Sequence, residues 1–133
     1  MIGLWKTYST EYLYVISVGT ILLFGLPLLI APIQWAKVLK WTIPDHQHLA
    51  IYFGRCLGGI ICVMAFYGFM STLDPGTMKF FFDFILLNFI AMVLIHVYGA
   101  MKKIQPKSET IEIIYWLFLV VVTLLFYPAD QFI

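Results

Sequence analysis

Four long apolar stretches alternate with short polar segments along the chain. The apolar stretches cover residues 12–30, 49–73, 78–101 and 111–127. Each is long enough to cross the hydrocarbon core of a bilayer, about 30 Å thick, as an α-helix that rises about 1.5 Å per residue. The pattern therefore predicts an all-α fold, an integral membrane four-helix transmembrane bundle formed by a single domain over residues 1–133.

Proline residues mark the breaks between the predicted helices. Pro27 is expected to bend the last turns of the first helix, because proline has no backbone N–H to donate. Pro44 predicts the opening of the second helix, since proline is tolerated in a first turn. Asp74 followed by Pro75 predicts the cap and the first residue of the third helix, and Ser108 is the expected cap of the fourth. The connecting loops are short, which favours antiparallel neighbours.

The composition agrees with a membrane protein. Hydrophobic residues make up 62% of the 133 residues and charged residues 11%, whereas a soluble domain is about 25% charged. Such a chain cannot cover a globular surface with polar groups, so the lipid bilayer is its expected surroundings. The formal net charge of +1 argues against nucleic acid as a partner.

The distribution of lysine predicts an orientation in the membrane. The segments after the first and third helices carry most of the lysines, namely Lys37, Lys40, Lys102, Lys103 and Lys107. The segment between the second and third helices contributes Lys79. Because loops rich in lysine and arginine stay in the cytoplasm, we expect both termini on the non-cytoplasmic side. The predicted location is the bacterial inner membrane, as a multi-pass protein.

Arg55 is the one charged residue between Ala50 and Phe69. It lies seven residues after His48, about 10 Å further along a helix, and is therefore expected below the cytoplasmic interface. His48, Tyr52 and Arg55 share one helix face, because positions i, i+4 and i+7 superpose. An arginine inside a bilayer costs from roughly 2.5 kcal/mol upward, so it needs a partner or a function.

The other three helices each place a polar side chain at a similar depth. His96 lies about 9 Å from the cytoplasmic end of the third helix, Glu112 begins the fourth, and Gln34 ends the first. These groups predict a pocket for a polar or anionic head, with Arg55 as the fixed charge. The structural alternatives are an Arg55–Glu112 pair that fixes helix order and an arginine that reaches lipid phosphate. The predicted ligand-binding residues are Arg55, His96, Glu112, His48, Tyr52 and Gln34.

The histidines raise the question of a cofactor. A bis-histidine haem b needs two imidazoles that face each other from different helices at one depth. His48 and His96 differ in depth by several ångströms. Histidines that bond backbone or lipid near the interface are the simpler interpretation. The sequence therefore predicts no cofactor and no metal site, with haem b as the alternative.

Two glycines and an asparagine indicate where helices pack against each other. Gly54 and Gly58 are spaced i, i+4, a stripe typical of helices whose backbones approach closely. The stripe suits packing within the bundle or self-association. Asn88, inside the third helix, is expected to form a hydrogen bond to a neighbouring helix.

A short motif in the second helix carries a resemblance. The run Arg55-Cys56-Leu57-Gly58, followed by an apolar stretch and Gly68, resembles the arginine-x-x-glycine opening of the second helix in DoxX-like small membrane proteins. Four spans in a chain of this length are similar as well. The resemblance implies an accessory membrane protein associated with lipid or quinone, and it transfers no catalytic residues.

The expected function is a small, non-catalytic membrane protein. It would bind a lipid-like or quinone-like ligand, or a partner membrane protein as an accessory subunit, within a homo-oligomer or a larger membrane complex. The alternative is a small membrane-embedded enzyme that acts on a lipid or isoprenoid substrate, because His96 or Glu112 could act as a general base. A third possibility is an oligomeric channel.

Overall fold

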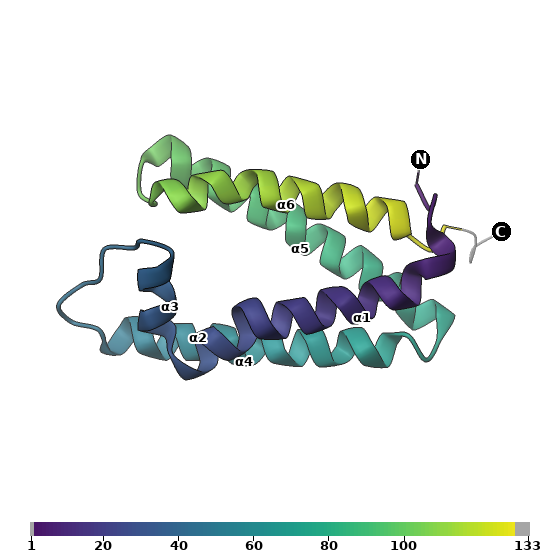
Figure 1. Ribbon diagram of the computed structural model, residues 1–133, viewed down its shortest axis with the longest axis horizontal. Coiled ribbons are helices and arrows are strands. Elements are labelled where there is room, and N and C mark those ends of the chain that lie inside the picture. Colours follow the sequence, from purple (N-terminus) through teal and green to yellow (C-terminus); the bar gives the residue numbers. More distant parts are fainter. Residues whose placement is uncertain (1, 130–133) are drawn as a thin grey trace.

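The computed structural model describes residues 2–129, and this part of the chain is helical with no strand (Figure 1). The first span is a composite of four short elements. These are a 3₁₀ turn η1 (Lys6–Tyr8), helix α1 (Ser9–Thr20), a π-helical turn η2 (Ile21–Gly25) and helix α2 (Leu26–Ile30). The elements that follow are α3 (Pro32–Val38), α4 (His48–Ser71), α5 (Pro75–Lys102) and α6 (Lys107–Phe126).

Four helical segments are long and apolar enough to cross a membrane. They are Lys6–Ile30, His48–Ser71, Pro75–Lys102 and Lys107–Phe126. The four predicted long apolar helices are therefore confirmed in number and order. Each helix begins between one and six residues before its apolar stretch, because polar first-turn residues extend it beyond the hydrophobic run.

Two predicted helix starts are wrong. Helix α4 begins at His48 rather than at Pro44. The side chains of Pro44, Asp45 and His46 are exposed, so no packing stabilises a helical turn there. Ser108 does not cap α6, because its hydroxyl donates a hydrogen bond to the backbone carbonyl of Leu39 instead.

The predicted start of α5 is confirmed. Asp74 Oδ2 accepts hydrogen bonds from the backbone N–H of Thr77 at 2.8 Å and from its hydroxyl at 2.9 Å, and Pro75 is the first helical residue. These bonds, the backbone one foremost, lower the pKa of Asp74 below its ordinary value.

The first span changes from α-helix to the π-helical turn η2 just before Pro27. Proline leaves the carbonyl of Leu23, four residues earlier, without the usual helical donor. The indole N–H of Trp35 donates to this carbonyl at 2.8 Å. Trp35 lies on α3, a helix that the sequence analysis treated as loop and that runs across the end of the bundle at a steep angle to the long helices (Figure 1).

The long helices form two pairs (Figure 1). Helices α1 and α2 pack along α4, and α5 packs along α6. Glycines of α4 permit the close approach of the first pair. A Cβ at Gly54 would lie 2.5 Å from Pro32 Cβ, and one at Gly58 would collide with the backbone of Gly25 and Leu29.

The two pairs meet at the end of the bundle that carries the chain termini, and they diverge toward the end that carries α3 (Figure 1). We call these the termini end and the cavity end. The apolar core extends from the termini end, and its buried members are Tyr12, Leu13, Met78, Phe81, Phe82, Ile85, Phe89, Trp116 and Leu119.

The N-terminal segment closes the termini end by backbone hydrogen bonds. Gly3 N–H donates to the carbonyl of Leu124 and Trp5 N–H to that of Leu125, at 2.9 and 2.8 Å. The Ser9 hydroxyl lies 2.6 Å from the carbonyl of Phe126. Carbonyls in the last turn of a helix have no partner within the helix, so the start of the chain completes the end of α6.

Candidate functional site

A cavity of about 340 Å³ lies between the two helix pairs. Its volume is within the range of about 300–1,000 Å³ that is typical of small-molecule sites. The pair formed by the first span and α4, together with α3 and the segment after it up to Trp41 (the α3 region), contributes mostly apolar and aromatic side chains. Among them are Phe24, Leu57, Ile61 and Met64. The second pair contributes Asn88, Phe89, Met92, His96, Glu109, Glu112, Tyr115, Trp116 and Leu119. The cavity therefore has apolar walls with a few polar groups.

The turn between α5 and α6 places a histidine opposite two glutamates. Lys103 takes the left-handed conformation, with φ 55°, and ends α5 in a Schellman motif, in which Ile104 N–H bonds the carbonyl of Gly99 and Lys103 N–H that of Ala100. The side chain of Gln105 then folds back, and its Nε2 donates to the carbonyl of His96 at 3.0 Å. Helix α6 starts directly afterwards, so its first turns face His96.

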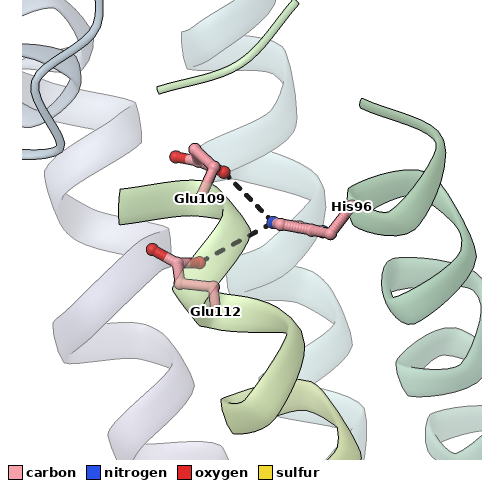
Figure 2. A group of neighbouring side chains, drawn as sticks. All are labelled: His96, Glu109 and Glu112. Atoms are coloured by element: carbon pink, nitrogen blue, oxygen red, sulfur yellow. Dashed lines mark hydrogen bonds and ion pairs between the residues drawn. The ribbon is translucent and has the colours of Figure 1, made fainter. Parts of the chain in front are cut away.

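His96, Glu109 and Glu112 converge on one point (Figure 2). The His96 ring extends from α5 toward both carboxylates of α6, and Nε2 lies 3.1 Å from Glu109 Oε2 and 3.8 Å from Glu112 Oε2. The side chains are 5%, 12% and 21% exposed, respectively. The spacing i, i+3 puts Glu109 and Glu112 on one face of α6. We call these three residues the His–Glu–Glu cluster.

The hydrogen bonds of His96 fix its tautomer. Nδ1 lies 2.7 Å from the carbonyl oxygen of Met92, which can only accept, so Nδ1 carries a proton and donates it. Nε2 lies at hydrogen-bond distance, 3.1 Å, from Glu109 Oε2, so it bonds that carboxylate when it carries a proton and presents a lone pair to both carboxylates when the ring is neutral. Such a set of one nitrogen lone pair and two carboxylates attracts a positively charged species, which is a proton or a metal ion.

The segment after α3 ties the cluster to the opposite helix pair. Trp41 Nε1 donates to Glu109 Oε1 at 2.8 Å, and Ser108 bonds the carbonyl of Leu39. Trp35 and Trp41 both line the cavity. The α3 region thus bridges the two diverging pairs at the cavity end and orients one of the carboxylates.

The predicted ligand-binding residues separate into two groups. His96 and Glu112 line the cavity and lie beside each other. The remaining four are exposed and do not line it; they are Arg55, His48, Tyr52 and Gln34. Within residues 2–129, Arg55 forms neither an ion pair with Glu112 nor a side-chain hydrogen bond. The polar face of α4 therefore lies outside the bundle, and the charges that face the cavity are acidic rather than basic.

Asn88 lines the same cavity, about 12 Å from His96 along α5. Its side chain has no hydrogen-bond partner in the described part of the chain, in contrast to the bond to a neighbouring helix that we expected. Its amide is available to a molecule in the cavity.

Glu109 and Trp41 lie at the site but are not among the predicted site residues. Glu109 was available from the pattern, because its i, i+3 spacing to Glu112 places both carboxylates on one helix face. Trp41 lies in an irregular segment, where no periodicity indicates the direction of a side chain.

No protein-family model, curated protein sequence or solved structure matches this chain. The resemblance to DoxX-like proteins therefore stays a prediction. The class that the fold defines is a multi-pass helical protein with four segments suited to cross a membrane. Its distinguishing feature is a cavity between two helix pairs with the His–Glu–Glu cluster in its wall.

Proposed function

We propose that this chain is a small protein of the bacterial inner membrane that binds one lipid-like molecule in the cavity. In the proposed orientation the loops at the cavity end face the cytoplasm and both termini face the other side, because most lysines lie at the cavity end. The observation that carries the proposal is the cavity itself, about 340 Å³ between the diverging helix pairs.

The walls of the cavity suit an apolar chain. Phe24, Ile61, Met64, Phe89 and Leu119 line it, and burial of apolar surface gains about 25 cal/mol per Å². A lipid tail is the apolar body that a bilayer supplies in abundance. The narrow volume favours one chain rather than a phospholipid with two.

The polar end of the cavity favours a lipid head group that can donate a hydrogen bond. Glu109 and Glu112 are acceptors, and Arg55, the one lysine or arginine of α4, does not line the cavity. An anionic head, one of the two kinds of head that the sequence predicts, would meet like charges here. A hydroxyl head, as in an isoprenoid or acyl alcohol, can donate a hydrogen bond to a carboxylate. We therefore propose a lipid alcohol in place of an anionic lipid.

The test fills the cavity with a larger side chain. Met92→Trp adds bulk at a lining position of α5, and Leu94→Trp makes the same kind of change at a position that is 64% exposed and does not line the cavity. We expect native mass spectrometry of gently extracted protein to show a retained lipid in the wild type and in Leu94→Trp. Met92→Trp should retain it at least about tenfold less, a loss of about 1.4 kcal/mol.

Equal lipid retention by both tryptophan variants would contradict the proposal. Co-purification of a partner protein with an empty cavity would favour the accessory-subunit alternative instead.

One observation favours a second candidate, an enzyme that acts on the same lipid. A histidine oriented by a carbonyl and flanked by two carboxylates is suited to move protons at a bound substrate. Incubation of the protein with the lipid it retains, followed by mass analysis of that lipid, separates the two functions. A changed lipid with wild type and an unchanged one with His96→Gln is the result that the enzyme requires.

A further inference from the structure

We propose that the His–Glu–Glu cluster binds one divalent transition-metal ion. The inference goes beyond lipid binding and also replaces the expectation of no metal site. His96 Nε2 and one oxygen from each glutamate all lie within 4.8 Å of one another. A metal ion binds such atoms at about 2.0–2.2 Å, which places ligand atoms about 3–4 Å apart. The separations of 3.1 and 3.8 Å from Nε2 match this spacing.

The histidine is prepared for a metal by its second nitrogen. A metal-binding histidine usually donates its other ring N–H to a carbonyl or carboxylate, which fixes the tautomer. His96 does so, with Nδ1 at 2.7 Å from the carbonyl of Met92. The Nε2 lone pair, on a side chain that is 5% exposed, is therefore aimed between the glutamates.

The glutamates are arranged in the same way. Glu109 uses its other oxygen, Oε1, to accept from Trp41 Nε1 at 2.8 Å. Its Oε2 contacts His96 Nε2 at 3.1 Å, and an ion would take the place of that contact. Glu112 Oε2, at 3.8 Å from Nε2, is beyond hydrogen-bond distance, and no other group in residues 2–129 donates to it. No lysine or arginine of this part of the chain forms an ion pair with either glutamate.

Charge balance favours a metal over a proton. A proton on Nε2 bonds Glu109 Oε2 but leaves Glu112 Oε2, at 3.8 Å, without a donor beside an apolar cavity. A divalent ion neutralises both carboxylates and contacts all three side chains.

The donor set indicates the class of ion. One imidazole nitrogen and two carboxylate oxygens suit Zn²⁺, Mn²⁺ or Fe²⁺, whereas Mg²⁺ and Ca²⁺ prefer oxygen ligands throughout. Three protein ligands leave at least one coordination position open. That position would be available to a molecule in the cavity that the three residues line.

The first test measures Mn²⁺ binding to the full chain in detergent after treatment with a chelator. Calorimetry should show one Mn²⁺ per chain for the wild type. His96→Gln and Glu112→Gln should each weaken binding at least about 100-fold, since loss of an outer partner alone costs about 10–100-fold. The matched controls are His48→Gln and Glu11→Gln, which change exposed residues outside the His–Glu–Glu cluster. Both controls should bind Mn²⁺ as the wild type does.

A second measurement does not depend on the folding of the site variants. The chain has three histidines, so His96 is the one left when His46 and His48 are both replaced by glutamine. Pulsed electron paramagnetic resonance of Mn²⁺ bound to this double variant should show coupling to an imidazole nitrogen. Loss of that coupling overturns the proposal, and so does a wild type that binds Mn²⁺ and Zn²⁺ no more tightly than His96→Gln.

The metal and the lipid proposals can fail separately. Met92→Trp should lose lipid but still bind Mn²⁺, because the His96 partner at residue 92 is a backbone carbonyl. Mn²⁺ binding without any retained lipid in the wild type would contradict the lipid proposal alone. Retained lipid without Mn²⁺ or Zn²⁺ binding would contradict the metal proposal alone.

Discussion

At the termini end of the bundle, the buried side chains of Tyr12 and Thr123 connect two helices, whereas at the cavity end His96 and Glu112 face a cavity. The Thr123 hydroxyl donates to the carbonyl of Leu119 at 2.7 Å, so the Tyr12 hydroxyl donates to Thr123 Oγ1 at 2.6 Å and joins α1 to α6. At the cavity end, His96 Nε2 lies 3.1 Å from Glu109 Oε2, and the carboxylate of Glu112 accepts no hydrogen bond from the residues that the structure describes.

The two ends of the bundle therefore differ in role: one end stabilises the fold, and the other is suited to bind a ligand. A buried polar group with no partner costs about 1–3 kcal/mol, so a fold retains it where something else compensates. The termini end supplies the apolar core and satisfied hydrogen bonds that can offset this cost. The cavity end carries the groups that are suited to bind.

The largest expected effect tests whether the termini end holds the bundle together. Phe82 is fully buried in the core, and Phe82→Ala should reduce the free energy of unfolding by about 3–5 kcal/mol. Its neighbour Phe80 is 70% exposed, and Phe80→Ala should cost less than about 1 kcal/mol. Unfolding in mixed detergent micelles, followed by circular dichroism, measures both. Similar losses for the two variants would show that the core does not lie where we place it.

The next prediction concerns the wall that α4 forms beside the cavity. A Cβ at Gly58 would lie 2.8 Å from Gly25 O and from Leu29 Cα, both backbone atoms that cannot rotate away. Gly58→Ala should therefore cost about 1–3 kcal/mol, as overpacking does. At Gly59 the nearest atom is the flexible end of Leu29, at 4.0 Å. Gly59→Ala should be neutral or raise stability by up to about 1 kcal/mol, the helix propensity gained.

The same unfolding experiment compares the two glycine variants. A loss at Gly59 as large as that at Gly58 would mean that α2 and α4 are not in close backbone contact. Self-association through the stripe would then be the better account of these glycines.

The sequence predicts the spans better than their faces. Apolar length defines each long helix, and the capping signal at Asp74 defines a helix start. Arg55 shows the limit of this reasoning. Periodicity identifies His48 and Tyr52 as residues that share its face. It does not indicate whether that face points into the bundle or away from it, because the rest of α4 is apolar on every side. The predicted pocket therefore included a face of α4 that lies outside.

Depth is the part of the site that the sequence predicts. His96 and Glu112 were expected at similar distances from the cytoplasmic end, and they lie beside each other. The rest of the cluster depends on backbone geometry that carries no periodic signal. The left-handed turn at Lys103 and the irregular chain before Trp41 determine how α6 and the α3 region meet His96.

The smallest expected effect concerns the two glutamates of the cavity end. Replacing Glu112 and replacing Glu109 should change the free energy of unfolding in opposite directions. Measured with a chelator present, Glu112→Gln removes a like charge at i, i+3 from Glu109 and should raise the free energy of unfolding by about 0.2–0.5 kcal/mol. Glu112 lies beyond the first turn of α6, so little helix-dipole energy is lost. Glu109→Gln disturbs the bonds to Trp41 and His96 and should lower stability instead. A greater loss for Glu112→Gln than for Glu109→Gln would mean that Glu112 stabilises the fold as the polar groups of the termini end do. The polar groups of the cavity end would then serve to hold the helices together and not to bind a ligand.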